Sequence, residues 1–199
     1  MKAWQDQGLL TDAAVWVNLS NRDMQNPDLA ETIGGIVSAV GLNPAALAVE
    51  ITETWIMANP ESAAGNIRHL QTLGIEVGID DFGTGYSSLA ALKHLAVCEL
   101  KIDQSFVAGL PEDTAGCAIA RAVIALSQAL GIKVVAEGVE TQTQADFLQR
   151  EGCRIAQGYL FSRPLPAAEF EAYVRDRTAA APDPRAGADG PDAEGRQSD

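Results

Sequence analysis

The sequence is poor in cysteine and histidine. Its three cysteines, Cys98, Cys117 and Cys153, are odd in number, far apart and form no Cys-x-x-Cys motif. This pattern argues against a disulfide framework and is typical of a reduced, cytoplasmic protein. The two histidines, His69 and His94, fall in helical stretches and not at strand ends, so we expect them on the surface and do not expect an imidazole metal site.

Positive charge is also scarce. The chain has 14 Lys and Arg against 27 Asp and Glu, a net charge of −13. Binding to long nucleic acid depends on Lys and Arg replacing the counterions of the phosphates, so a long nucleic acid is not an expected partner. A chain this acidic needs a metal cation to hold a phosphate group.

Long apolar stretches are missing as well. The segment MKAWQDQGLL has no apolar core of the kind found in signal peptides, and no window reaches 18 apolar residues. These absences predict neither export nor a membrane span in this chain. What remains is a composition of 47% hydrophobic and 21% charged residues, which is ordinary for a globular domain with one sizeable core.

The C-terminal segment differs from the rest in composition. It is rich in Ala, Pro, Gly and Asp, and Thr178 is its only β-branched residue. Such a segment buries too little apolar surface to offset the entropy of ordering. We therefore expect a folded domain over 1–177 and a disordered acidic tail over 178–199.

Short apolar runs alternate with helical periodicity along the folded part. The runs predict strands at 14–20, 47–52, 75–81, 98–103, 133–139 and 154–161. Apolar residues between them recur at helical spacing, as in 28–40 and 115–130. Six βα units predict a parallel α/β sheet, with strand interiors that are apolar on both faces.

Several residues mark the ends of these helices. Asp28 is a candidate N-cap, Asn59-Pro60 opens a helix that Gly74 ends, and Thr141 with Gln144 forms a candidate capping box.

A polar residue stands near the end of each predicted strand. These residues are Asn18, Glu50, Asp80, Lys101, Glu137 and Gln157. In a βα-barrel or an open α/β sheet the carboxyl ends of the strands form the active face. Any one such residue is explained by solvation of a strand end, but six at one rim indicate a functional site.

Carboxylates dominate this rim. Glu50, Asp80, Asp81 and Glu137 offer charged oxygens and Asn18 a neutral one, a set that suits Mg²⁺ or Mn²⁺ better than zinc. Neighbouring side chains in a strand point to opposite faces. A turn after the strand, permitted by glycines, would let both aspartates face one site, where two cations about 3.5–4 Å apart could act on a phosphate.

Two side chains at the rim have alternative roles. Lys101 either neutralises the surrounding carboxylates or orients an attacking water and contacts the phosphate. Glu137 either ligates the second metal or accepts the proton of that water.

Six segments, taken together, resemble the EAL-domain cyclic di-GMP phosphodiesterases. They are VNLS (17–20), EITE (50–53), DDFGTGYSSL (80–89), LKIDQSFV (100–107), VVAEGVET (134–141) and QGYLFSRPL (157–165). They occur in the family's order and at its approximate spacing, and cover 1–175. The resemblance implies a variant TIM barrel with one antiparallel strand, about six of its eight strands being present. It also implies hydrolysis of cyclic di-GMP to linear pGpG with two Mg²⁺ or Mn²⁺ ions.

The resemblance assigns a role to each rim residue. Asn18, Glu50 and Asp80 would bind the first metal, and Asp80, Asp81 and Glu137 the second. Lys101 would hold the catalytic water.

Three further residues would support the site. Gln157 would help fix it from the last strand, and Glu140 would support it from outside the ring of ligands. Glu53 would brace the DFGTGYSS loop, which this family links to dimerisation.

The sequence departs from the family pattern at its start. It has no Glu-Ala-Leu motif, whose glutamate is a metal ligand, and Met1 falls inside an expected helix. Two strands and a phosphate-contacting arginine would then be missing, and the open sheet edges favour pairing with another chain. We expect the chain alone to be impaired or inactive, and to form oligomers or to act with an upstream regulatory domain.

The sequence leaves two other functions open. A degenerate EAL module could bind cyclic di-GMP or a protein without cleaving it, although the nearly full set of metal ligands argues against this. A barrel aldolase or sugar-phosphate isomerase would need a glycine-rich phosphate cradle in the last two loops, which read EGVETQTQ and FSRPLPAAEF.

Overall fold

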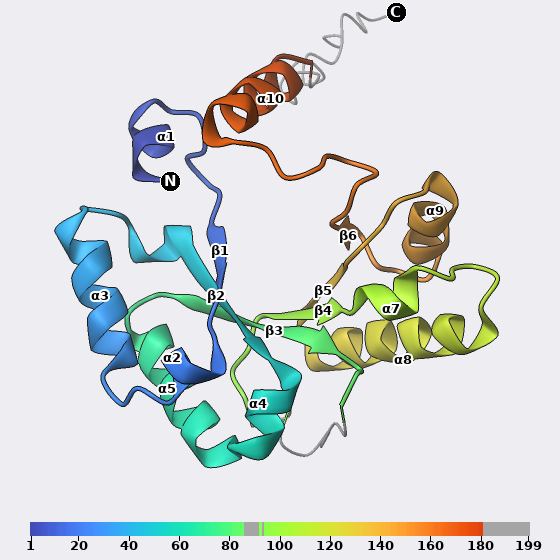
Figure 1. Cartoon of the computed structure of the whole chain (residues 1–199), viewed down its shortest axis with the longest axis horizontal. Coiled ribbons are helices and arrows are strands. Elements are labelled where there is room, and N and C mark those ends of the chain that lie inside the picture. The colour runs from blue at the N-terminus through green and yellow to red at the C-terminus, as the bar shows by residue number, and fades with distance from the viewer. Residues whose placement is uncertain (86–91, 93, 181–199) are drawn as a thin grey trace, which may run out of the picture. The chain divides into compact units, whose positions relative to one another are not determined.

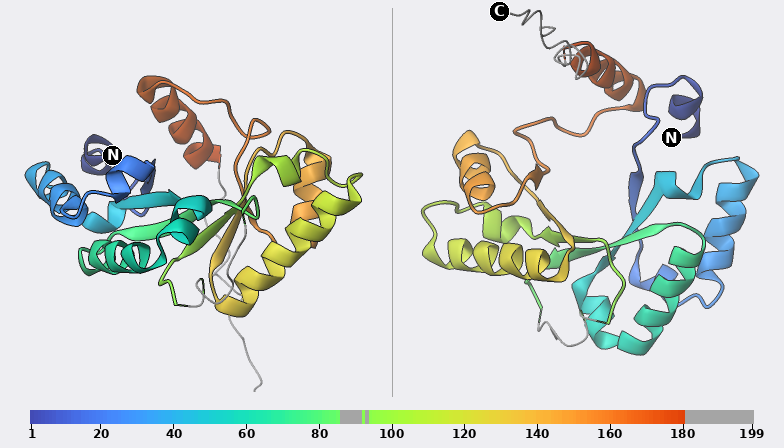
Figure 2. Two further views of the ribbon diagram at one scale, coloured as in Figure 1. Left: turned by 60° about the horizontal axis from the view of Figure 1, so that its bottom comes forward. Right: turned by 180° about the vertical axis from the view of Figure 1, so that it is seen from behind.

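The computed structural model describes residues 1–85, 92 and 94–180. Six strands form one sheet in the order β1 to β6, and all five pairings between neighbours are parallel. The strands are β1 (Val15–Asn18), β2 (Leu47–Thr52), β3 (Glu76–Phe82), β4 (Glu99–Ile102), β5 (Lys133–Ala136) and β6 (Ile155–Ala156). The sheet curls into a half-barrel, which confirms the truncated, TIM-barrel-like α/β fold (Figures 1 and 2).

All six predicted strands are present, but the last is far shorter than expected. β6 has two residues, because the chain turns at Gly158. A Cβ at Gly158 would lie 2.2 Å from the carbonyl oxygen of Val139, so the backbone there packs too closely for any side chain. The antiparallel strand that the family resemblance implies is not among the strands of the described residues.

Helices connect the strands. They are α1 (Lys2–Asp6), α2 (Asn21–Met24), α3 (Leu29–Ala39), α4 (Glu53–Ala58), α5 (Pro60–Thr72), α7 (Gln104–Val107), α8 (Thr114–Leu130) and α9 (Gln142–Arg150), with a 3₁₀ turn at Pro44–Ala46. None of the helices in the described ranges combines the length and apolar character needed to cross a bilayer.

The predicted helix ends are largely confirmed. Gly74, the predicted end of the helix that Pro60 opens, has φ 82° just after α5, and Gly131 likewise ends α8 in the left-handed conformation with φ 68°. Thr141 and Gln144 form both bonds of a capping box at α9. Asp28 occupies the N-cap position of α3, but its side chain makes no capping hydrogen bond.

The chain divides into two compact units, Met1–Pro164 and Leu165–Asp199. The described part of the second unit contains helix α10 (Ala167–Ala180), which extends three residues into the segment predicted to be disordered. Alanine is the strongest helix former, and both Ala179 and Ala180 continue the helix. Residues 181–199 lie outside the described residues.

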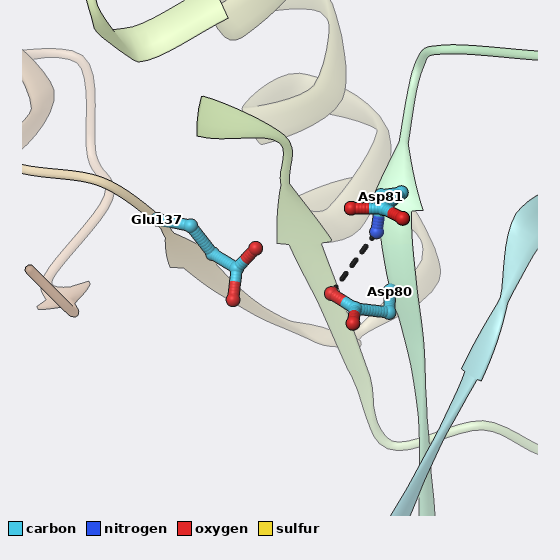
Figure 3. Close-up of side chains that lie close together, drawn as sticks. All are labelled: Asp80, Asp81 and Glu137. Carbon is cyan, nitrogen blue, oxygen red and sulfur yellow. Dashed lines mark hydrogen bonds between the residues drawn. The ribbon is translucent and has the colours of Figure 1, made fainter. Parts of the chain in front are cut away.

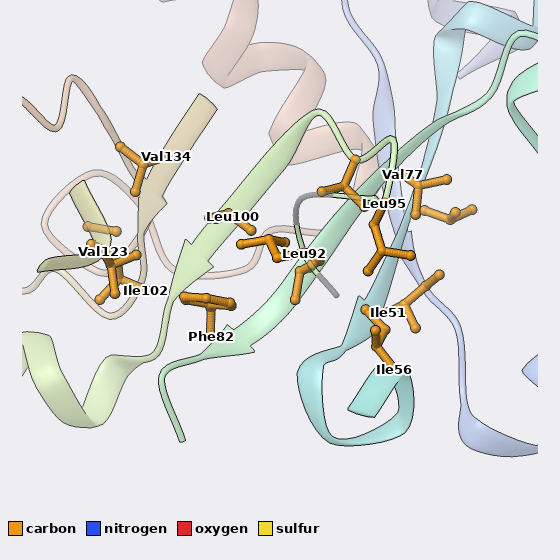
Figure 4. Packing of buried hydrophobic residues seen from close by; sticks show 14 of the residues in the cluster. Ile51, Ile56, Val77, Phe82, Leu92, Leu95, Leu100, Ile102, Val123 and Val134 are labelled. Atoms are coloured by element: carbon orange, nitrogen blue, oxygen red, sulfur yellow. The ribbon is translucent and has the colours of Figure 1, made fainter. Parts of the chain in front are cut away.

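The hydrophobic core lies on the outer face of the sheet, under the helices (Figure 4). Alternate strand residues supply it, among them Ile51, Val77, Leu100 and Ile102, each at most 1% exposed. Helices α4, α5 and α8 contact this face. Each fully buried aliphatic side chain stabilises the fold by about 1.5–3 kcal/mol, so this layer holds the strand ends in position.

The inner face of the sheet is charged, so the prediction of strands apolar on both faces is wrong. Glu50, Glu99 and Lys101 point inward and are at most 7% exposed. Nearer the start of the strands, Glu76 and Lys133 form an ion pair at 3.9 Å. Opposite charges on nearby strands offset the free-energy cost of burying each charged group. Such pairing across strands is visible only in the folded structure.

The sheet does not close within the described residues, as the missing strands predict. β1 and β6 are its edges. Val15 and Val17 on β1 are 38% and 43% exposed, and Ile155 on β6 is 46% exposed.

Candidate active site

The end of β3 brings two adjacent carboxylates to one place. Asp81 has φ 55° and is the only non-glycine residue with positive φ in the described ranges. The pairing of β3 with β4 shifts between Ile79 and Phe82, so the extra residue interrupts the normal alternation. The Asp81 amide donates to Asp80 Oδ1 at 3.1 Å, which fixes the turn (Figure 3).

The predicted cause of this turn needs a correction. Gly83 has a positive φ of 102°, but Gly85 is not in the left-handed region. The decisive change of direction occurs at Asp81 itself. A non-glycine residue there costs of order 1–3 kcal/mol, which the surrounding structure must offset.

Asp80, Asp81 and Glu137 converge as predicted. One oxygen from each lies within 4.8 Å of the others, and Figure 3 shows the three carboxylates directed toward a shared space. Burial, followed by the charge of Asp80, raises the pKa of Asp81. Burial likewise raises the pKa of Glu137, although Lys101 opposes this shift. Both shifts are caused first by burial of the carboxyl groups, and the like charge of Asp80 adds to each.

Lys101 joins three strands of the rim. Its Nζ lies 2.8 Å from Glu50 Oε2, 3.2 Å from Asp80 Oδ1 and 2.5 Å from Glu137 Oε1. Burial pulls the pKa of Lys101 down, but its hydrogen bonds to Glu137 and Glu50 outweigh burial and hold the pKa above its ordinary value. The geometry fits the neutralising role weighed for this lysine, and its role toward water stays a prediction.

Asn18 completes the cluster from the first strand. Asn18 and Glu50 are register partners across β1 and β2. With its amide nitrogen turned toward them, Asn18 donates to Glu50 Oε2 and Asp80 Oδ2, both at 3.1 Å. With the amide turned the other way, its neutral oxygen faces Glu50 and Asp80, and that is the orientation in which a cation could be shared by the three side chains.

Glu53 lies behind the loop that follows β3. It begins α4, is 1% exposed, and its Oε2 accepts hydrogen bonds from the backbone N–H groups of Gly83 at 2.9 Å and Gly85 at 3.4 Å. A Cβ at Gly85 would lie 3.4 Å from Glu53 Cδ, so a glycine allows the close approach. This is the bracing geometry predicted for Glu53. Residues 86–88 of the predicted DFGTGYSS loop lie outside the described residues.

The structure does not bring the remaining two predicted residues into the cluster by their side chains. Gln157 is exposed, and it is held beside Glu137 through its backbone, which bonds to Ala136 at 2.8 Å and Val139 at 3.0 Å. Glu140 is exposed too, and its backbone N–H donates to Gln144 Oε1 at 2.8 Å.

Asp103 was missed by the sequence analysis. Its side chain caps α7, accepting from the Ser105 amide at 2.9 Å, and its charge helps to raise the pKa of Asp81. The sequence offered one indication, because Asp103 follows Lys101 by two residues and so points to the same face.

Comparison with known proteins identifies the family of this chain. The family model described as the EAL domain matches residues 1–164. The chain belongs to the EAL domain family.

Two curated relatives come from Pseudomonas aeruginosa. The chain is 40% identical over 174 residues to the bifunctional diguanylate cyclase/cyclic di-GMP phosphodiesterase MucR, covering 87% of this chain and 25% of MucR. It is 42% identical over 145 residues to the cyclic di-GMP phosphodiesterase RocR, covering 73% of this chain and 37% of RocR. The EAL chain thus spans well under half of either relative.

Solved structures agree with this assignment. The PaMucR phosphodiesterase in complex with c-di-GMP superposes with a TM-score of 0.80 at 39% identity, over 85% of this chain and 73% of that one. The EAL domain of Mycobacterium smegmatis DcpA gives 0.82 at 39%, over 87% and 78%. The manganese/cy-diGMP complex of Klebsiella pneumoniae BlrP1 gives 0.74 at 34%, over 81% and 42%.

Proposed function

We propose that this chain carries the metal-binding face of a cyclic di-GMP phosphodiesterase, which hydrolyses one phosphodiester bond to give linear pGpG. The observation that carries the proposal is the convergence of Asp80, Asp81 and Glu137 around Lys101. The names of the relatives and the c-di-GMP complexes of solved EAL domains support the substrate.

The residues of the cluster suit two Mg²⁺ or Mn²⁺ ions. The donors are carboxylate oxygens and one amide, the ligands that hard divalent cations prefer. Burial raises the pKa of Asp81 and of Glu137, the charge of Asp80 adds to both shifts, and a bound cation would favour the ionised forms of the two carboxyl groups. BlrP1 is solved as calcium and manganese complexes with the same dinucleotide, which supports a divalent ion here.

The ligands divide between the two ions. Asn18, Glu50 and Asp80 would hold the first, and Asp80, Asp81 and Glu137 the second. When bound, the ions supply Lewis acidity toward the phosphate and compensate its charge.

The protein's own groups would act on the water and the proton. Lys101 donates a hydrogen bond that orients the attacking water in line with the bond to be broken. As the alternative to ligating the second ion, Glu137 would accept the proton of that water. Attack at phosphorus breaks the P–O3′ bond, leaves a 5′-phosphate on the linear product and frees a 3′-oxygen that takes up a proton from solvent to become a hydroxyl group.

Glu53 would connect the cluster to the following loop, and through it to a second copy of the chain. Gln157 and Glu140 would assist from the margin of the site. A homo-oligomer or an upstream regulatory domain fits the two open sheet edges, because exposed strands favour pairing.

A second candidate is binding of cyclic di-GMP without cleavage. The open half-barrel favours it, since Asn18 lies on an edge strand and is not covered by a further strand of the described residues. Catalysis by metal ions depends on fixed coordination. A metal ligand on an edge strand, such as Asn18, would therefore reduce the rate of hydrolysis more than the binding of cyclic di-GMP. We infer that the chain alone is impaired as a catalyst.

Calorimetry combined with product analysis tests these functions. We expect the chain to bind Mn²⁺, to bind cyclic di-GMP when Ca²⁺ is present, and to release pGpG slowly with Mn²⁺. Asp80→Asn should weaken Mn²⁺ binding and remove the hydrolysis. Binding without any pGpG would favour the second candidate, and a chain that binds no Mn²⁺ would refute both metal-dependent functions.

A further inference from the structure

The single-turn helix α7 lies between the two segments that carry the second cation site. It follows β4 directly and precedes α8. Its Val107 is fully buried, so packing in the core holds the helix in position. None of the proposed metal ligands lies on α7. The helix nevertheless contacts the segment after β3 and the segment after β5.

The first contact is with the turn that holds Asp81. Asp103, the N-cap of α7, lies close enough to Asp81 for its charge to help raise the pKa of that carboxyl group. Gly83, two residues after Asp81, lies against the ring of Phe106: a Cβ built on Gly83 would lie 3.0 Å from Phe106 Cε2. The turn is therefore held between Phe106 on one side and Glu53 on the other.

The second contact is with the residue after Glu137. Gly138 has φ 66°, and a Cβ built on it would lie 2.7 Å from the Cβ of Gln104. The backbone at Gly138 rests directly on the first residue of α7. The contact with α7 therefore restricts where the backbone can place Glu137 after the end of β5.

Gln144 makes the third contact and does more than cap a helix. Its side chain is 5% exposed, and its Oε1 accepts from the N–H groups of Glu140 at 2.8 Å and Thr141 at 3.0 Å. Its Nε2 donates to the carbonyl oxygen of Ala108, at the end of α7, at 3.1 Å. The buried side-chain amide of Gln144 therefore links the segment after Glu137 to α7 by hydrogen bonds.

These contacts meet a physical need. Asp80, Asp81 and Glu137 repel one another, and their spacing decides whether a cation fits between them. Side chains that hold the backbone on both sides of the gap keep that spacing when no cation is bound.

We propose that α7 sets the distance of Glu137 from Asp80 and Asp81, and that Gln104, Phe106 and Gln144 are positioning residues for the second cation. The proposal rests on the metal-dependent function argued above. It identifies residues that touch neither the cation nor the substrate and act through Asp81 and Glu137.

Gln144→Glu in the full chain tests the fastening amide. Glutamate keeps an acceptor for Glu140 and Thr141, but it loses the donor and turns an oxygen toward Ala108. Gln149→Glu is the matched control, because it adds the same charge at an exposed position of α9. In a two-site Mn²⁺ titration by calorimetry, we expect Gln144→Glu to weaken the second step about tenfold and the first step little, with the control unchanged.

Gly138→Ala provides an independent test. Gly131→Ala is its control, since Gly131 has nearly the same φ, 68°, with no atom within 4 Å of an added Cβ. The two variants share the backbone strain and differ in the clash with Gln104. We expect Gly138→Ala to weaken the second Mn²⁺ step about tenfold beyond its control. Adding Gln104→Gly should restore most of that loss, and adding Gln104→Ala should not, because alanine keeps the clashing Cβ.

The outcomes separate this proposal from the function beneath it. A chain that binds no Mn²⁺ overturns the proposed function and this inference together. A chain that binds Mn²⁺, with Gln144→Glu and Gly138→Ala equal to their controls, overturns this inference alone. If Gln144→Glu fails to fold by circular dichroism, rescue of Gly138→Ala by Gln104→Gly decides the question, and absence of rescue counts against the proposal.

Discussion

Lys101 Nζ lies 2.5 Å from Glu137 Oε1, and the same nitrogen reaches Glu50 on a strand two places away in the sheet. One ammonium group therefore joins the two sides of the carboxylate cluster. This relationship makes the stability of the half-barrel depend on charge compensation at its rim.

Replacing this lysine should destabilise the fold. In Lys101→Met, Glu50, Asp80 and Glu137 lose their common partner, and breaking a buried ion pair costs about 3–5 kcal/mol. Urea unfolding measures the loss, and Mn²⁺ should recover part of it by taking over the compensation. Lys133→Met, at an exposed ion pair, serves as the control and should cost under about 1 kcal/mol. Equal losses in both variants would contradict the central role of Lys101.

Glu99 should make stability depend on pH. Burial, followed by the charge of Glu50, raises the pKa of Glu99 from 4.5 to about 6. The folded chain therefore binds this proton more tightly than the unfolded chain, so the contribution is fully present below pH 4.5 and is lost as the pH rises through about 6.

Glu99→Gln removes that loss. At about 1.4 kcal/mol per pKa unit, we expect it to raise the free energy of unfolding at pH 7 by about 2 kcal/mol and to flatten the profile between about pH 4.5 and 6. Urea unfolding across this pH range measures both effects. Glu76→Gln, at the exposed pair with Lys133, should leave the slope in place. An unchanged slope in Glu99→Gln would refute the assignment.

Gly78 should resist substitution because of Trp16. A Cβ at Gly78 would lie 2.9 Å from Cζ3 of the Trp16 ring on the inner face of the sheet. We expect Gly78→Ala to destabilise the chain by about 1–3 kcal/mol, the usual cost of overpacking. Gly35→Ala, in α3 with open space around it, should instead stabilise by about 0.5–1 kcal/mol. Thermal unfolding compares them, and a neutral Gly78→Ala would show that the ring moves freely.

Glu53→Gln should loosen the turn after β3. The neutral amide oxygen is a weaker acceptor for the N–H groups of Gly83 and Gly85 than a carboxylate. We expect amide hydrogen exchange at these two glycines to accelerate by about tenfold, which corresponds to about 1.4 kcal/mol of lost local stability. Exchange rates in α8, measured in the same experiment, should not change. Equal acceleration in both regions would mean a global loss of stability.

The open edges should make the chain self-associate. Val15 and Val17 on β1 are exposed, and unpaired strand edges form hydrogen bonds with other chains. We expect light scattering to show a concentration-dependent rise in mass, and Val17→Lys to reduce it. A monodisperse monomer at high concentration would contradict this expectation.

The sequence predicted the parts of the site that depend on periodicity. Apolar runs located all six strands, and polar strand ends located Glu50, Asp80 and Glu137, because parallel strands deliver their ends to one rim. Residues whose role depends on contacts distant in sequence were less accessible. Gln144 looked like half of a capping box, and its bond to Ala108 is visible only once α7 and α9 are packed.

Two errors have a common physical origin. The charged inner face departs from the expectation that parallel strands are apolar on both faces, because Glu99 and Lys101 alternate with Leu100 and Ile102 in β4 and are buried with them. The predicted dependence of this turn on glycines is also wrong, since a positive φ is uncommon for non-glycine residues in general but occurs here at Asp81. In both cases tertiary compensation overrode a local preference.

The backbone at Asp81 leaves very little substitutional freedom. Asparagine tolerates a left-handed conformation but carries no charge, glutamate carries the charge but bears a longer side chain ill suited to that conformation, and glycine offers neither side-chain oxygen nor charge. Aspartate alone combines both requirements. Position 81 therefore separates shape from charge experimentally, because Asn keeps the turn and Glu keeps the charge, so comparing the two variants shows which property the chain can least do without.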